Sequence, residues 1–241
     1  MSSRQDELVG NRLALIGALV YLLEWVAIFA VGESGPTLPG TSTAETVQIY
    51  SDNAGGQALM AGWFSLVLLG RVALAVGIRD ALRRSPRQLP FADLAVGAMV
   101  VSVVLEISAF AVAGAAGYLA DQGGDPTAII ALDAAGGWLF LLIYAPIGVF
   151  LAAMSWAVLR SGLFPAWMGW LGLAAGALGM VGGVLGGPAY GTGGFMDVTE
   201  GLTSAAAVGF WVWMIVVGIR LYRRTPRDGS VGTSPNATSS A

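Results

Sequence analysis

The chain has 241 residues, of which 56% are hydrophobic and only 11% are charged. A soluble domain carries about a quarter of its residues as charges, so this apolar fraction exceeds what a globular core can hide and lipid must cover the remainder. The chain contains no histidine, cysteine or lysine, and all of its cationic side chains are arginines.

These absences exclude several kinds of chemistry. Without histidine or cysteine there is no haem ligation of the usual kind, no thiolate or imidazole zinc site, no disulfide and no cysteine nucleophile. Without lysine no Schiff base can form, which excludes retinal and pyridoxal phosphate chemistry. No metal-ligand pattern and no GxxxxGK[ST] loop occurs. We therefore expect no metal, no cofactor, no ATP hydrolysis and no nucleic-acid partner.

Apolar runs close to the length of a bilayer crossing predict an all-α, polytopic membrane bundle of about six transmembrane helices. The predicted spans are residues 13–31, 58–78, 94–119, 127–159, 165–186 and 202–221. A cleaved signal peptide competes with the first span, because small residues follow it near Ala30 and Gly32. The run is long for a signal peptide and contains Glu24, which favours a retained span.

Two connections have recognisable local signals. Ser42-Thr43-Ala44-Glu45 resembles a capping box, which predicts a short surface helix ending near Asp52. In the fourth span, we expect Asp133 to lie at the water boundary and Pro146 to kink the middle of the helix.

The arginines predict the orientation. In a six-span arrangement the connections on one side carry all the loop and terminal arginines, and those on the other side carry acidic residues and no arginine. By the positive-inside rule the arginine side is cytoplasmic, so both termini lie inside a bacterial plasma membrane. We expect residues 1–224 to form one transmembrane domain and residues 225–241, rich in Ser, Thr, Gly and Pro, to form a disordered cytoplasmic tail.

Three ionisable residues fall inside the predicted spans: Glu24, Arg71 and Glu106. At about 1.5 Å per residue, both glutamates lie at a similar depth near the midplane, and Arg71 lies within snorkelling reach of the inner interface. Charged groups at this depth usually face the bundle interior. The glutamates are candidate acids for catalysis or ligand binding. Alternatively, each is a structural hydrogen-bond partner or pairs with Arg71.

Two further patterns bear on the interior of the bundle. Trp25 follows Glu24 directly, and an aromatic ring beside a buried acid would suit a cation. In the fifth span, Gly172, Gly176, Gly179 and Gly183 form a small-residue stripe on one helical face. The simplest interpretation of the stripe is helix packing, with a ligand groove or a homo-oligomer face as alternatives.

Two stretches resemble the DUF4386-type family of uncharacterised multi-pass proteins, common in actinobacteria. These are residues 161–172, SGLFPAWMGWLG, and residues 44–50, AETVQIY. The resemblance implies a six-helix membrane fold and brings no activity or functional residues with it.

The leading hypothesis is an integral membrane protein that binds or transports a small amphipathic or cationic molecule, or an accessory membrane subunit, with Glu24, Glu106, Arg71 and Trp25 as ligand-binding candidates. One alternative resembles the small integral-membrane terpene cyclases, with a buried glutamate as the general acid. The other is a purely structural subunit. Expected partners are the lipid bilayer, a small hydrophobic or cationic ligand, and a homo-oligomer or partner subunit.

Overall fold

The computed structural model describes residues 3–32, 36–37, 41–192 and 196–224, and these residues form helices and connections without any strand. The α-helices, in chain order, are α1 (Ser3–Leu22), α2 (Glu24–Val31), α3 (Thr43–Asp52), α4 (Ala54–Val67), α5 (Leu69–Ala81), α6 (Leu89–Asp121), α7 (Pro126–Leu142), α8 (Tyr144–Ser161), α9 (Ala166–Thr192) and α10 (Met196–Tyr222).

Six helical stretches of the described chain are long and apolar enough to cross a membrane. They are Val9–Val31, Ala54–Arg84, Pro86–Asp121, Pro126–Ser161, Ala166–Tyr190 and Asp197–Tyr222. The predicted all-α polytopic fold is therefore confirmed. The third stretch begins earlier than expected because Pro90 lies in the first turn of α6, where a missing N–H removes no helical hydrogen bond. The predicted tail, residues 225–241, lies outside the described part of the chain.

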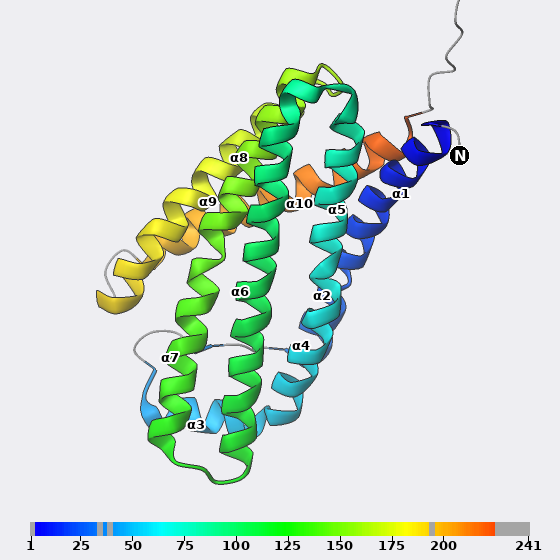
Figure 1. Cartoon of the computed structure of the whole chain (residues 1–241). Coiled ribbons are helices and arrows are strands. Elements are labelled where there is room, and N and C mark those ends of the chain that lie inside the picture. The colour runs from blue at the N-terminus through cyan, green and yellow to red at the C-terminus, as the bar shows by residue number, and fades with distance from the viewer. Residues whose placement is uncertain (1–2, 33–35, 38–40, 193–195, 225–241) are drawn as a thin grey trace, which may run out of the picture.

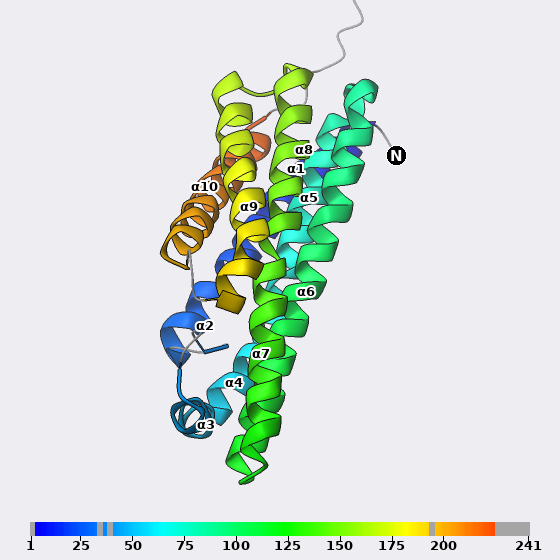
Figure 2. The same ribbon diagram turned by 90° about the vertical axis from the view of Figure 1, so that its left-hand side faces the viewer.

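The six stretches lie side by side in one elongated bundle (Figures 1 and 2). The α5–α6 connection, the α8–α9 connection, the start of α1 and the end of α10 lie toward one end. We call this the arginine end, because Arg83, Arg87, Arg160 and Arg223 belong to these segments. The turn between α6 and α7 lies at the opposite end, which α3 covers; we call it the α3 end.

Three of the stretches are interrupted. The fourth breaks at Ile143, between α7 and α8. Pro146 explains this break, because its ring conflicts with the carbonyl of Leu142, the last residue of α7, and it has no N–H to donate. The first and second stretches break at Leu23 and Leu68 without a proline. There the backbone closes tighter three-residue turns, with Val26 N donating to Leu23 O and Arg71 N to Leu68 O.

Helices α1 and α5 cross closely just after the break at Leu68. A Cβ on Gly70 would lie 2.7 Å from the backbone nitrogen of Tyr21, which is closer than Cβ atoms approach other heavy atoms in proteins. Only glycine permits this approach. As a result, Tyr21 and Arg71, which follow these contacts on α1 and α5, lie against each other.

The glycine stripe of α9 faces α8 and α10 of the same chain. A Cβ on Gly176 would lie 2.8 Å from Ala152 N, and one on Gly183 would lie 2.6 Å from Ala145 N. Gly172 adjoins Ser155 and Trp213, and Gly179 adjoins Tyr144 and Gly148. The stripe is thus taken up inside the bundle, so a homo-oligomer would need another surface.

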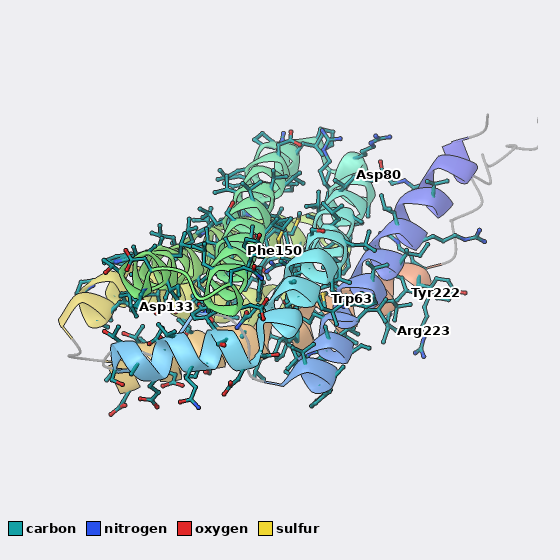
Figure 3. All side chains as sticks on the ribbon, turned by 90° about the horizontal axis from the view of Figure 1, so that it is seen from below. Trp63, Asp80, Asp133, Phe150, Tyr222 and Arg223 are labelled. Carbon is teal, nitrogen blue, oxygen red and sulfur yellow. The ribbon has the colours of Figure 1, made fainter. Side chains whose placement is uncertain are left out.

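The short helix α3 lies across the α3 end of the bundle (Figure 3). Its N-cap is Ser42, whose hydroxyl accepts a 3.3 Å hydrogen bond from Glu45 N, as the capping signal predicts. Tyr50 is fully buried and packs with alanines of α6 and with Ile129 of α7.

The prediction for Asp133 was wrong. Its side chain does not lie at a water boundary but is buried, with 7% exposure, beneath the segment that leads into α3. It accepts hydrogen bonds from the Tyr50 hydroxyl at 2.9 Å, from Thr37 N at 2.7 Å and from the Thr37 hydroxyl at 2.8 Å. These three donors replace the water that the carboxylate would otherwise need.

Candidate functional site

A cavity of about 700 Å³ runs through the bundle from the α3 end to the middle of the membrane-spanning region. Its walls come from helices α1, α2 and α4 to α10. Near the α3 end it is lined by Gly32, Pro36, Thr37 and Tyr190. At its deeper end it reaches Glu24, Arg71 and Glu106, so all three ionisable residues that the sequence places inside spans line one space.

The chain breaks position this charged cluster. Glu24 is the first residue of α2, directly after the break at Leu23. Arg71 is the third residue of α5, directly after the break at Leu68. Glu106 lies in the middle of α6. Local helical irregularity often coincides with functional positions, since it redirects side chains that a regular helix would point elsewhere.

Arg71 does not extend toward the interface. Its side chain is 1% exposed, and its Nη2 donates to Glu106 Oε2 in a buried ion pair. The guanidinium also lies over the ring of Tyr21, 4.9 Å from the ring centroid. The pair is electrically neutral, and the cation–π contact adds a further favourable interaction for the buried cation.

Glu24, unlike Glu106, makes no ion pair among the described residues, and one of its oxygens is buried without a partner. The residue is 3% exposed, and its Oε1 has no hydrogen-bond partner within the described residues. Arg71 Nε is likewise buried without a partner in this part of the chain. A buried polar atom left unsatisfied destabilises the folded state by about 1 to 3 kcal/mol. The cluster therefore offers polar atoms that a bound molecule could satisfy.

Besides Tyr190, seven aromatic residues line the cavity. They are Tyr21, Phe64, Phe110, Phe140, Tyr144, Phe210 and Trp211.

Several of these rings pack against one another in a row along the wall. Phe64 and Phe110 have centroids 4.2 Å apart, and Phe110 and Phe140 lie edge to face at 6.2 Å. On the other wall, the indole N–H of Trp211 donates to the hydroxyl of Tyr21 at 3.2 Å. The cavity thus combines an apolar, shape-defining lining with one polar end.

The structure brings together three of the four predicted ligand-binding residues. The fourth, Trp25, does not line the cavity. It packs edge-on against Trp211, with centroids 4.6 Å apart, and beside Phe29. Trp211 is the tryptophan at the wall, and Trp25 supports it from behind.

The tyrosines and phenylalanines of this wall were not among the predicted residues, although helical spacing contained a signal for them. Tyr21 precedes Glu24 by three residues, and Phe110 follows Glu106 by four. Residues three or four apart share a helical face. An aromatic residue at this spacing from a buried acid therefore indicated which rings face the same space.

Asp133 holds one of the residues that line the cavity near the α3 end. Thr37 lines the cavity and also donates twice to Asp133. Tyr50 on α3 donates to the same carboxylate. Burial and, secondarily, the Asp133 charge raise the pKa of Tyr50 above its ordinary value, so the phenol stays protonated and remains a donor.

The described residues contain no group of three or more acidic side chains that could hold a metal ion. The arrangement is suited instead to holding an elongated molecule with one polar end. Fold and cavity together define the chain as a multi-pass helical membrane protein with an internal, aromatic-lined cavity that ends in a buried charged cluster.

The family model described as Domain of unknown function (DUF4386) matches residues 15–218, and the chain belongs to this family. The match includes the whole charged cluster and every residue that lines the cavity. No curated protein and no solved structure matches the sequence.

Proposed function

We propose that this protein binds a small amphipathic molecule inside the membrane, with its apolar body among the aromatic rings and its polar end against Glu24, Arg71 and Glu106. The observation that carries the proposal is the convergence of these three residues at one end of an otherwise apolar cavity. Ligand sites typically have about 300 to 1,000 Å³ of space and a few polar groups in an apolar lining.

The size of the cavity limits the molecule. About 700 Å³ accommodates a single-chain amphiphile or a drug-sized compound. The ligand is therefore smaller than a bilayer lipid.

A transporter and an accessory subunit would both first have to bind the ligand. A transporter would release the ligand on the other side, and an accessory subunit would present it to a partner. We place the arginine end in the cytoplasm of a bacterial cell, which follows from the distribution of arginines. In this orientation the cavity begins on the outer side.

The test is to fill the cavity. Ala207 lines it, whereas Ala205 is exposed on the outside of the same helix. We expect wild-type protein and Ala205→Trp to bind dodecylamine or dodecanol as one adduct per chain in native mass spectrometry. We expect Ala207→Trp to lose that adduct because the indole occupies its space. Equal adduct formation by both variants would contradict the proposed site.

An enzymatic role in the same cavity is the second candidate. Glu24 is an acid with an uncommitted oxygen, and aromatic rings would stabilise a carbocation formed nearby. In that case a linear polyprenyl chain incubated with the protein would yield cyclised products by gas chromatography, and Glu24→Gln would yield none. Unchanged polyprenyl chain with wild-type protein would eliminate this candidate.

A further inference from the structure

We propose that the ligand of this cavity is a monocation, an amphiphile whose single protonated amine lies against Glu24. This inference rests on the proposed function, because it assigns the charge of the molecule that the cavity binds. It follows from the inventory of charges around the cavity and from the pairing already made within it.

Within the described chain, the acidic and guanidinium side chains that line the cavity are Glu24, Arg71 and Glu106. Arg71 and Glu106 are ion-paired and neutralise each other. An ammonium group beside Glu24 would stabilise the ionised carboxylate, which then carries the one negative charge of the cluster that is not paired with Arg71. The deep end of the cavity is therefore complementary to one positive charge.

Burial makes this complementarity selective. Only 3% of the Glu24 surface is exposed to solvent. In a medium of low dielectric, an uncompensated charge is strongly unfavourable, and an opposite charge nearby relieves most of that penalty. An ammonium group would supply both the charge and hydrogen-bond donors, whereas a hydroxyl would supply a donor alone.

The remaining contacts favour the same class of ligand. The indole of Trp211 lines the cavity next to Tyr21, with which it is hydrogen-bonded, and aromatic faces attract cations. A carboxylate or sulfate head group would meet a net negative cluster. A second ammonium at the same end would have to compete with Arg71 for Glu106.

The experiment compares three probes with identical chains: dodecylamine, dodecanol and dodecanoate. Each is titrated by native mass spectrometry against wild-type protein released from neutral detergent micelles. We expect wild-type protein to bind dodecylamine roughly tenfold or more tightly than dodecanol, as a charge-assisted hydrogen bond predicts. We expect dodecanoate to bind more weakly than either.

The variant Glu24→Gln removes the charge and retains the shape. It should bind dodecanol about as well as wild-type protein and should lose the preference for dodecylamine. Glu45→Gln makes the same chemical change at an exposed position on α3 and should leave the preference intact. Unchanged dodecanol binding by Glu24→Gln shows that the variant is folded.

The outcomes separate the inference from the function on which it rests. Equal affinity of wild-type protein for dodecylamine and dodecanol would overturn the monocation assignment and leave the binding function in place. Loss of amine preference in Glu45→Gln as well as Glu24→Gln would also overturn it. Absence of any adduct with all three probes would overturn the proposed function itself.

Discussion

We expect Arg71 and Glu106 to have large individual effects on stability, because they form a buried ion pair. Each is buried, and each compensates the charge of the other. Two ions removed from water are strongly penalised, and their attraction offsets this only while both are present. Breaking the pair is therefore far more damaging than replacing both partners with apolar residues.

At this scale we predict that Glu106→Ala destabilises the folded protein by about 3 to 5 kcal/mol, because it leaves the Arg71 guanidinium buried and unpaired. The double variant Arg71→Met/Glu106→Leu should regain most of that loss. Thermal unfolding of the purified protein measures both. If the double variant unfolds as early as Glu106→Ala, the pair is not the reason for the loss.

For single residues, the sequence predicts which side chains are unusual but not which partners they contact. Glu24, Arg71 and Glu106 were identifiable because a charged residue in an apolar run is conspicuous. Pairing with Arg71 was only one of the alternatives, because the choice between the two glutamates depends on helix breaks at Leu23 and Leu68, where the sequence has no proline. Asp133 was misplaced because its partners, Thr37 and Tyr50, are about 90 residues away in the chain.

At the scale of elements, α3 is the only described helix outside the six membrane-crossing stretches. It is too short to be stable alone, since isolated helices below about 12 residues are marginal in water. Its docking depends on Tyr50, which packs against α6 and α7 and donates to Asp133.

We predict that α3 undocks at alkaline pH. The pKa of Tyr50 is raised in the docked state by burial and by Asp133, so its contribution is complete below the ordinary tyrosine pKa of about 10 and declines as the pH rises above it. A spin label on Ser51→Cys would report this as increased mobility. The chain has no native cysteine to compete for the label and no lysine that titrates in this range.

The control for this prediction is the same label combined with Tyr50→Phe. That variant lacks the titrating hydroxyl, so its label mobility should not change over the same alkaline range. An equal alkaline transition in Tyr50→Phe would assign the effect to another group.

The packing of α9 on α8 gives a second prediction at this scale. Gly176→Ala should destabilise the protein by about 1 to 3 kcal/mol, because its Cβ would lie 2.8 Å from two backbone atoms of α8. Gly97→Ala is the matched control: this glycine is also within a helix, but no atom lies within 4 Å of the added Cβ. It should be neutral or stabilising by up to about 1 kcal/mol. Similar unfolding temperatures for the two variants would contradict the close packing.

At the scale of the whole molecule, the six crossings bring both ends of the described chain to the arginine end, as Figure 1 shows. The ion pairs Arg79–Asp93 and Arg83–Asp80 lie there as well, and both are partly exposed. Pairs of this kind contribute little to stability. We propose that the arginines at this end act chiefly by orienting the protein in the membrane.

The orientation gives the last prediction. Ser51 on α3 and Ser85 between α5 and α6 lie at opposite ends of the molecule. In intact bacterial cells a membrane-impermeant maleimide should label Ser51→Cys, and it should label Ser85→Cys only after permeabilisation. The reverse pattern would place the arginine end outside and move the cavity entrance to the cytoplasm.

The sequence by itself determined the membrane environment, the helical class and the number of crossings. These properties depend on the length and polarity of contiguous runs, which the chain shows directly. The kink at Pro146 and the cap at Ser42 were also local, since each depends on neighbouring residues alone.

Only the tertiary structure decided which buried groups meet. The Arg71–Glu106 pair, which leaves out Glu24, and the Asp133 contacts involve residues from different helices. Their proximity depends on close glycine crossings and on helix breaks that rotate one half of a span relative to the other. A lipid-facing helix shows an apolar surface whichever way it is turned, so the sequence pattern alone leaves its rotation, and therefore its partners, undetermined.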